Sequence, residues 1–433
     1  MNKSILRLAI PNIISNLTVP ILGSVDTALV GHLSHVYYLG AIAVGGMIFN
    51  FIYWGFGFLR MGTTGLTAQA FGNDNESESI HLLIRALMVS VVIGLSLIVL
   101  QKPIAWLSFN LVHATPEVEY HARVYFYIRI FAAPATLSLY ALQGWFLGMQ
   151  NAKLPLILAV FINVMNIVSD VIFIKFFGMN SEGVAFGTLV AQYSGLILAI
   201  FLFHKYYNKL TQKIDYKRII DLTALKKFFS VNRDIFIRTL CLIFTFSYFT
   251  VKSAEFGDDI LAVNTILLQL WMIFSYGIDG FAFAAESLIG RFMGAGSREQ
   301  LRFAVRRIFT WGVGLGMLFM LVYLLFGKQI ISVFTDKEYL VDLAMIYFGW
   351  TIFAPFMNSF SYIWDGIYIG ATASAAMRNS MMLSTFLVFL PVWFLSRIYI
   401  GNHGLWLAMI SFMVMRAISL SFMAKRHIFD QLA

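Results

Sequence analysis

The chain has 433 residues, of which 59% are hydrophobic and only 12% are charged, and its mean hydropathy is +0.78. Soluble domains carry about 25% charged residues, so this composition excludes a soluble globular protein and predicts a polytopic membrane protein. The net charge of +9 is spread over short loops between apolar runs, so we expect no nucleic-acid partner. The single cysteine, Cys241, excludes a disulfide framework and a cysteine metal site.

Twelve apolar runs are long enough to cross about 30 Å of hydrocarbon as helices. We therefore expect an all-α polytopic membrane protein, with twelve transmembrane helices in two pseudo-symmetric six-helix bundles. The expected spans cover residues 5–33, 38–71, 82–108, 119–149, 153–178, 183–204, 227–252, 258–293, 303–334, 341–371, 376–399 and 403–426.

Basic residues crowd the connections on one side of these spans, around 205–227 and 291–307, which is the positive-inside pattern. With an even number of spans both termini lie on that side. We therefore expect both termini in the cytoplasm and the chain in the plasma (inner) membrane. Lys3 and Arg7 precede the first span without an evident small-residue cleavage site, which indicates a retained helix rather than a signal peptide.

The two halves of the chain repeat at an offset of 222 residues, which carries Gly55 to Gly277 and Gly144 to Gly366. Six spans per half is an even number, so the halves enter the membrane in the same orientation, and duplicated bundles of this kind rock about a central cavity. We expect a monomer. The expected domains are an N-terminal lobe at 1–204, a cytoplasmic inter-lobe linker at 205–226 and a C-terminal lobe at 227–433.

Carboxylates inside the expected spans support the first functional hypothesis. Asp26 and Asp170 each lie within a long apolar run, where an ionised carboxylate costs about 2.5 to 3.5 kcal/mol on insertion scales. Such residues usually face a protein interior or an aqueous cavity. On the fifth span, Asn163 and Asn166 share a helical face with Asp170 at i, i+3 and i+7. This pattern predicts a buried proton or cation site.

Three further polar side chains are candidates for the same site. Thr188 lies about one turn into the sixth span, and Tyr125 and Gln143 lie in the fourth. Carboxylate, amide and hydroxyl groups suit a hard cation or a proton-linked hydrogen-bond network, not a soft transition metal. The alternative is a structural network of hydrogen bonds between helices.

Asp26 and Asp170 would share a proton if their carboxylates face each other, because burial and like charge together oppose two ionised groups. The 222-residue offset takes them to Tyr248 and Val392, so the acidic pair exists in one half only. Pro11 interrupts the first span and predicts a bend, to which the protonation of Asp26 would couple. A static kink is the alternative.

Charged residues elsewhere in the spans form a second set. Arg60, in the second span, requires a carboxylate, backbone carbonyls or water as its partner. In the second half opposite signs are nearly balanced, which favours buried ion pairs that fix helix packing over a second transport site. These residues are Arg238, Asp279, Glu286, Asp365 and Arg378.

Six stretches, in order along the chain, resemble the multidrug and toxic compound extrusion (MATE) transporters. The arginine-containing motif of the second span and the DG-rich motifs of the second lobe are similar to the DinF-like branch of that family. The resemblance covers essentially the whole chain. The stretches read SVDTALVGH, GFLRMGTTGLTAQAFG, GWFLGMQNAKLP, FINVMNIVSD, DGFAFAAESLIGRFMGAG, and WDGIYIGAT with MRNSMMLS.

The resemblance implies a V-shaped protein of twelve helices in two lobes, which exports organic cations and other amphipathic compounds against entry of H⁺ or Na⁺. It also implies that the first helix bends at Pro11. In similar members two aspartates, an asparagine and a threonine form a first-lobe cation site. Their positions match Asp26, Asn166, Asp170 and Thr188.

One departure from the family's pattern concerns the second lobe. Members with a sodium site there have a glutamate in the seventh helix, where this chain has Tyr248 and Lys252. This departure speaks against a second-lobe sodium site, although Asp365 keeps an acidic residue in the tenth helix.

These observations favour a cation-coupled antiporter that exports small amphipathic, cationic compounds by alternating access, with membrane lipids around it and no cofactor. The alternative is a flippase for lipid-linked saccharides, which would line its cavity with basic residues such as Arg60. An enzyme is not expected, because no histidine pair, serine nucleophile elbow or metal motif occurs in any span. A passive channel is not expected either, because the lobes repeat no pore-lining filter.

Overall fold

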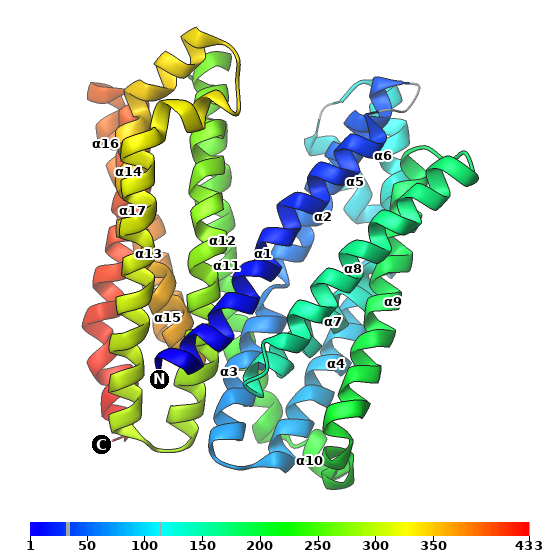
Figure 1. The fold of residues 1–433 in the computed structure, drawn as a ribbon, viewed down its shortest axis with the longest axis vertical. Coiled ribbons are helices and arrows are strands. Elements are labelled where there is room, and N and C mark those ends of the chain that lie inside the picture. Colours follow the sequence, from blue (N-terminus) through cyan, green and yellow to red (C-terminus); the bar gives the residue numbers. More distant parts are fainter. Residues whose placement is uncertain (32–34, 113, 433) are drawn as a thin grey trace. The chain divides into compact units, whose positions relative to one another are not determined.

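Helices make up nearly all of the chain in the computed structural model, which describes residues 1–31, 35–112 and 114–432 (Figure 1). A few side chains of the first helix, that of Asp26 among them, lie outside the described part. No strand occurs in the described ranges. The predicted all-α fold class is therefore confirmed.

Short connections join the helices of each half in chain order. The first half contains α1 (Asn2–Val30), α2 (Val36–Gly55), α3 (Phe58–Gly72), α4 (Glu76–Val99), α5 (Gln101–Leu111), α6 (Pro116–Arg129), η1 (Ile130–Ala132), α7 (Ala133–Gly148), α8 (Lys153–Val171), η2 (Ile172–Phe176), α9 (Ser181–Tyr207), η3 (Asn208–Lys213) and α10 (Tyr216–Ile219). The second half contains α11 (Leu222–Ala254), α12 (Asp258–Gly294), α13 (Arg298–Ser332), α14 (Glu338–Gly370), α15 (Ser374–Met382), η4 (Leu383–Phe389), α16 (Leu390–Ile400), α17 (Asn402–Ala424), η5 (Lys425–Phe429) and η6 (Asp430–Leu432).

Eleven helical stretches within the described ranges are long and apolar enough to cross a membrane. Some join neighbouring elements: Val36–Gly72 unites α2 with α3, and Pro116–Gly148 unites α6 with α7. The remaining long helix, α1, has 29 residues. At 1.5 Å per residue it is about 43 Å long, enough to cross the hydrocarbon. Each of the twelve predicted spans therefore has a helical counterpart.

The predicted duplication is also seen in the packing of two equivalent helix pairs, one in each half. A Cβ added to Gly144 on α7 would lie 2.3 Å from the carbonyl oxygen of Arg60 on α3. One added to Gly366 on α14 would lie 2.3 Å from the carbonyl oxygen of Ala282 on α12. Both partners move by the same 222 residues, from 60 to 282 and from 144 to 366. Each half therefore contains the same glycine-mediated crossing of two helices, where only a missing side chain lets the backbones approach.

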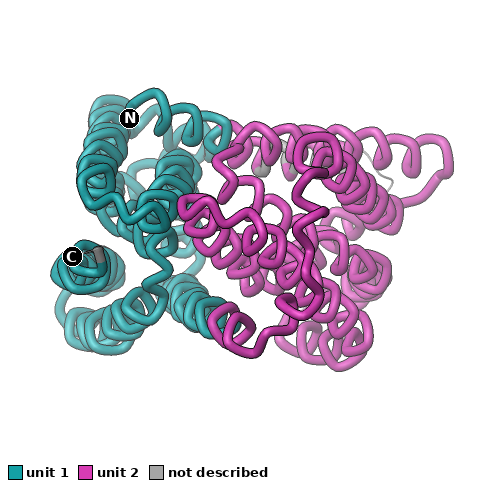
Figure 2. Tube along the Cα trace, turned by 90° about the horizontal axis from the view of Figure 1, so that it is seen from below, with its two compact units in different colours: residues 1–13, 229–433 teal, residues 14–228 magenta. Residues whose placement is uncertain are grey.

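Contacts divide the chain into two units, coloured separately in Figure 2. The N-terminal unit comprises Ile14–Phe228, and the C-terminal unit comprises Met1–Ile13 and Phe229–Ala433. The first turns of α1 belong to the C-terminal unit because they pack on α12. A Cβ added to Gly280 would lie 2.3 Å from Cγ1 of Ile13 and 2.8 Å from the carbonyl oxygen of Ala9. The expected domain boundaries of two lobes at 1–204 and 227–433, with a linker at 205–226, stay a prediction.

The start of α4 shows how local sequence fixes an element. The side chain of Asn75 accepts a hydrogen bond from the backbone N–H of Glu78, 2.9 Å away, and so caps the helix. Glu76 and Glu78 lie in the first turn, where carboxylates interact favourably with the positive end of the helix dipole. The acidic run at 73–79 is therefore a helix start.

The segment between the halves docks on the same end of α4. Arg85 is 1% exposed, and its guanidinium donates to the carbonyl oxygens of Arg218 and Ile219, 2.5 and 3.0 Å away. His81 accepts a hydrogen bond through Nε2 from the backbone N–H of Asp215 at 2.9 Å. The residues from η3 to α10 are therefore held by specific bonds within the N-terminal unit.

Candidate functional site

The predicted polar face of α8 forms a buried pair. The amide nitrogen of Asn166 donates to both carboxylate oxygens of Asp170, at 3.3 Å each, and the two residues are one helical turn apart. Asn166 is 3% exposed and Asp170 is fully buried. Asn163 lies on the same helix and is only half-buried. The structure thus places a carboxylate and an amide together inside a membrane-spanning stretch.

A glycine on the neighbouring helix makes room for this carboxylate. A Cβ added to Gly187 on α9 would lie only 1.7 Å from Oδ1 of Asp170. Two nonbonded heavy atoms cannot approach so closely, so the carboxylate occupies the space that a side chain at 187 would fill. The sequence reasoning missed Gly187, although its position directly before Thr188 is a signal that could have pointed to it.

Thr188 lies on the same turn of α9 and is half-buried. Its hydroxyl donates to the carbonyl oxygen of Val184 in its own helix, 3.0 Å away. A hydroxyl oxygen that donates its hydrogen still carries lone pairs that can accept a proton donor or coordinate a cation. Thr188 therefore has an oxygen that could act as a ligand, and its predicted place in the cation site stays a prediction.

The remaining members of the predicted site differ in how far the structure describes them. The backbone of Asp26 belongs to α1, but its side chain lies outside the described residues, so its pairing with Asp170 stays a prediction. Pro11 lies inside α1, which is helical on both sides of it. The predicted bend at this residue also stays a prediction.

Tyr125 belongs to a cluster between α2 and α6. It is 2% exposed, and its hydroxyl accepts a hydrogen bond from Nη1 of Arg129 at 2.5 Å. The same guanidinium lies 4.9 Å from the ring centre of Phe49. A Cβ added to Gly45 would lie 2.3 Å from the Tyr125 ring. These contacts favour a packing role for Tyr125, and its predicted place near the cation site stays a prediction.

Gln143 and Arg60 lie at the crossing of α3 and α7. Both are half-buried, and the neighbouring Gly144 packs against the Arg60 carbonyl. The crossing places the two polar side chains on adjacent helices of the N-terminal unit.

Buried charges in the C-terminal unit form ion pairs. Asp365 on α14 binds Arg238 on α11 and Arg416 on α17 through one carboxylate oxygen, Oδ2. All three side chains are at most 7% exposed. The pairs join three helices, as expected of charges that fix packing. The sequence reasoning named Arg238 and Asp365 but missed Arg416, which lies within an apolar run just as Arg60 does.

A second ion pair in this unit joins Arg378 on α15 to Asp234 on α11, with Nη1 2.6 Å from Oδ1. Asp234 also accepts a hydrogen bond from Ser374 at 3.2 Å. Sequence reasoning named Arg378 but not its partner. The other two predicted charges, Asp279 and Glu286, lie on α12, where Glu286 is 1% exposed.

Comparisons with known proteins agree over almost the whole chain. A family model described as MatE matches residues 11–172 and 235–395. The DNA damage-inducible protein F of Escherichia coli (strain K12) is 37% identical over 98% of this chain and 92% of its own length. The multidrug resistance protein NorM of Vibrio cholerae is 24% identical over 94% of this chain and 92% of its own length.

The fold also matches a solved structure. A crystal structure described as MATE in the bent conformation superimposes with a TM-score of 0.88 at 20% sequence identity. The match covers 99% of this chain and 96% of that one. At this identity the match concerns the fold alone.

Proposed function

Because the chain belongs to the MatE family of transporters, we propose that it couples the export of small amphipathic compounds to the entry of H⁺ or Na⁺. The relative from Vibrio cholerae is named a multidrug resistance protein, which supports drug-like cargo for this chain as well. Organic cations are the substrate class that we propose. They suit a carrier that takes up a competing positive charge at an acidic site.

The fully buried carboxylate of Asp170 is the observation that carries this proposal. A charge inside a membrane-spanning stretch is expensive unless it is paired, hydrogen-bonded or neutralised. Asn166 donates two hydrogen bonds to this carboxylate. Because Gly187 has no side chain, the carboxylate packs directly against α9. In the proposed site this carboxylate takes up a proton or a sodium ion, with Asp26 and Thr188 as further ligands.

Coupling requires only that the cation and the cargo favour different conformations of the transporter. In the proposed cycle, a cation from outside occupies the Asp170 site and stabilises the state that releases cargo outward. Loss of that cation to the cytoplasm restores the state that binds cargo. The bend that Pro11 predicts in α1 would be one element of this change.

The termini would lie in the cytoplasm, since twelve spans would put both ends on the same side as the basic connections around 205–227 and 291–307. The chain is a multi-pass membrane protein, and we propose that it resides in the inner membrane as a monomer. A cysteine-accessibility probe at either terminus would test the orientation.

Drug efflux from cells carrying Asp170→Asn tests the function and the site together. We expect efflux driven by an imposed pH or Na⁺ gradient to fall to the level of cells without the transporter, because an amide takes up no proton in this pH range and lacks the negative charge that would hold Na⁺. Asp26→Asn should behave in the same way. The gradient that drives the wild type identifies the coupling ion.

The matched control is Asp342→Asn, an exposed carboxylate that pairs with Lys328. Full efflux in the Asp170 variant at normal membrane abundance would refute the site. Movement of lipid-linked saccharide without any ion gradient would favour the flippase instead.

A further inference from the structure

Four basic side chains line a groove at one end of the C-terminal unit. The groove has a volume of about 470 Å³ and lies between the start of α13 and the last turns of the chain. Its polar lining comprises Arg298, Arg302 and Arg306 from α13, Lys425 from η5 and Asp430 from η6. Four cations face one carboxylate, so the groove carries a net positive charge.

The positive charge of this groove is concentrated on one helix face and is only weakly compensated by the nearby carboxylate. Arg298, Arg302 and Arg306 are each four residues apart, so they lie above one another on a single face of α13, where like charges repel. Asp430 approaches Arg298 no closer than 4.0 Å, and both side chains are more than 40% exposed. An anion in the groove would relieve this repulsion.

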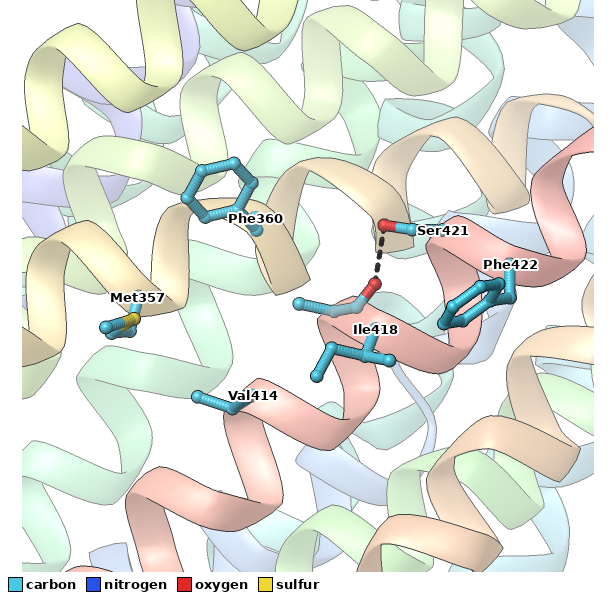
Figure 3. A pocket seen from close by; sticks show the side chains of 7 residues that line it. Met357, Phe360, Val414, Ile418, Ser421 and Phe422 are labelled. Atoms are coloured by element: carbon cyan, nitrogen blue, oxygen red, sulfur yellow. Dashed lines mark hydrogen bonds between the residues drawn. The ribbon is translucent and has the colours of Figure 1, made fainter.

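An apolar groove of about 450 Å³ lies between α14 and α17 of the same unit (Figure 3). Met357 and Phe360 line it from α14, and Val414, Ile418 and Phe422 line it from α17. Ile418 is 44% exposed and Phe422 is 82% exposed. In a membrane-spanning stretch, such a surface is suited to a hydrocarbon chain.

The two grooves lie close to each other where α17 continues into η5. Phe422, in the apolar groove, precedes Lys425, in the basic groove, by three residues, which is roughly 5 Å along a helix. On α13, Phe309 follows Arg306 by three residues, and its ring centre lies 6.1 Å from that of Phe360 in the apolar groove. A ligand that occupies both grooves therefore has an anionic group at one end and an apolar tail within about one helical turn of it.

We propose that the C-terminal unit binds an anionic phospholipid here, with its phosphate among the arginines of α13 and one acyl chain against α17. Arginine suits a phosphate because its planar guanidinium donates two parallel hydrogen bonds. Basic pockets at the ends of membrane-spanning helices hold anionic headgroups in this manner. Nucleotide or inorganic phosphate would leave the apolar groove unoccupied, which is why we assign the site to a lipid of the adjoining leaflet.

Native mass spectrometry of the full chain in detergent tests the headgroup contact. The probes are phosphatidylglycerol and phosphatidylcholine with identical acyl chains. In the variant Arg298→Gln/Arg302→Gln/Arg306→Gln, we expect the affinity for phosphatidylglycerol to fall by roughly fivefold for each arginine removed. Binding of phosphatidylcholine, whose choline cation offsets the charge of its phosphate, should change far less, and an unchanged melting temperature shows that the variant is folded.

A matched control removes the same charge from exposed positions of the N-terminal unit, in the variant Lys205→Gln/Lys209→Gln/Lys217→Gln. An equal loss of phosphatidylglycerol in this control would overturn the proposal, since attraction would then depend only on net charge. Unchanged binding in the arginine variant would overturn it as well.

The acyl contact has its own test. Phe422→Ser should weaken phosphatidylglycerol binding several-fold, whereas Leu395→Ser, at a comparably exposed apolar position on α16, should not. Inorganic phosphate at matched concentration should fail to displace the lipid. Displacement by phosphate, or equal effects of the two serine variants, would show that no acyl chain is held and would refute the lipid assignment.

Discussion

Asp170 and Gly187 form a contact in which the position of the Asp170 carboxylate depends on the absence of a side chain at Gly187. The carboxylate is fully buried, is held by Asn166 and fills the space beside Gly187. Because protein interiors are closely packed, an added methyl group at this point cannot be absorbed without movement. Residue 187 therefore controls the geometry of the proposed cation site without binding the cation.

Replacing Gly187 with alanine should displace the Asp170 carboxylate and impair cation-driven efflux. Overpacking of this kind costs roughly 1 to 3 kcal/mol, so the protein should still fold with a lowered melting temperature. Efflux and melting temperature would be measured together. In the control, Gly46→Ala, the new methyl group meets no atom within 4 Å. Normal efflux by Gly187→Ala would show that the position of the carboxylate does not matter.

At the scale of elements, the segment between the halves is anchored to α4 by the side chain of Arg85. This buried guanidinium donates to two carbonyl oxygens at the end of α10 and pairs with Glu78 at 2.6 Å. The carbonyls at a helix end need such partners. Lys213 adds an ion pair with Glu76, and Ser77 donates to the Lys213 carbonyl at 3.1 Å. The segment is thus a fixed part of the N-terminal unit.

Arg85→Gln should loosen this segment. Losing a charged donor to these carbonyls costs about 1.5 to 3 kcal/mol per hydrogen bond, and the loss should destabilise this segment rather than the whole protein. Amide hydrogen exchange should become faster over residues 208–220 and stay unchanged over α8. Arg123→Gln, which removes a more exposed pair with Glu119, is the control. Equal exchange in Arg85→Gln and the wild type would contradict the anchoring role.

At the scale of the whole molecule, the duplicated halves share their packing but not their polar chemistry. The crossings at Gly144 and Gly366 are equivalent under the 222-residue offset. The same offset takes Arg85 to Arg307, which is exposed and lies 5.1 Å from the ring of Phe303. Duplication therefore preserved the backbone crossings, while buried charges diverged between the halves.

Alanine at either crossing should destabilise the protein to a similar extent. In Gly144→Ala and Gly366→Ala, the methyl group would meet a backbone oxygen at 2.3 Å, which no side-chain rotation relieves. Each should lower the melting temperature by several degrees, in line with a cost of roughly 1 to 3 kcal/mol. Gly349→Ala, which meets nothing within 4 Å, should leave it unchanged. A large effect of only one crossing variant would argue against equivalent packing.

Sequence by itself determined the twelve spans, the duplication and the presence of charges where hydrocarbon disfavours them. Hydropathy and periodicity are properties of consecutive residues, so they can be read without knowing which helices meet. The shared face of Asn166 and Asp170 followed in the same way from their spacing on α8, and the structure adds the hydrogen bonds between them. Only the tertiary structure decided that Gly187 gives space to Asp170, that Arg416 joins Arg238 at Asp365, and that Arg85 anchors α10. Each of these contacts joins different helices, and which faces meet depends on the packing of the whole unit.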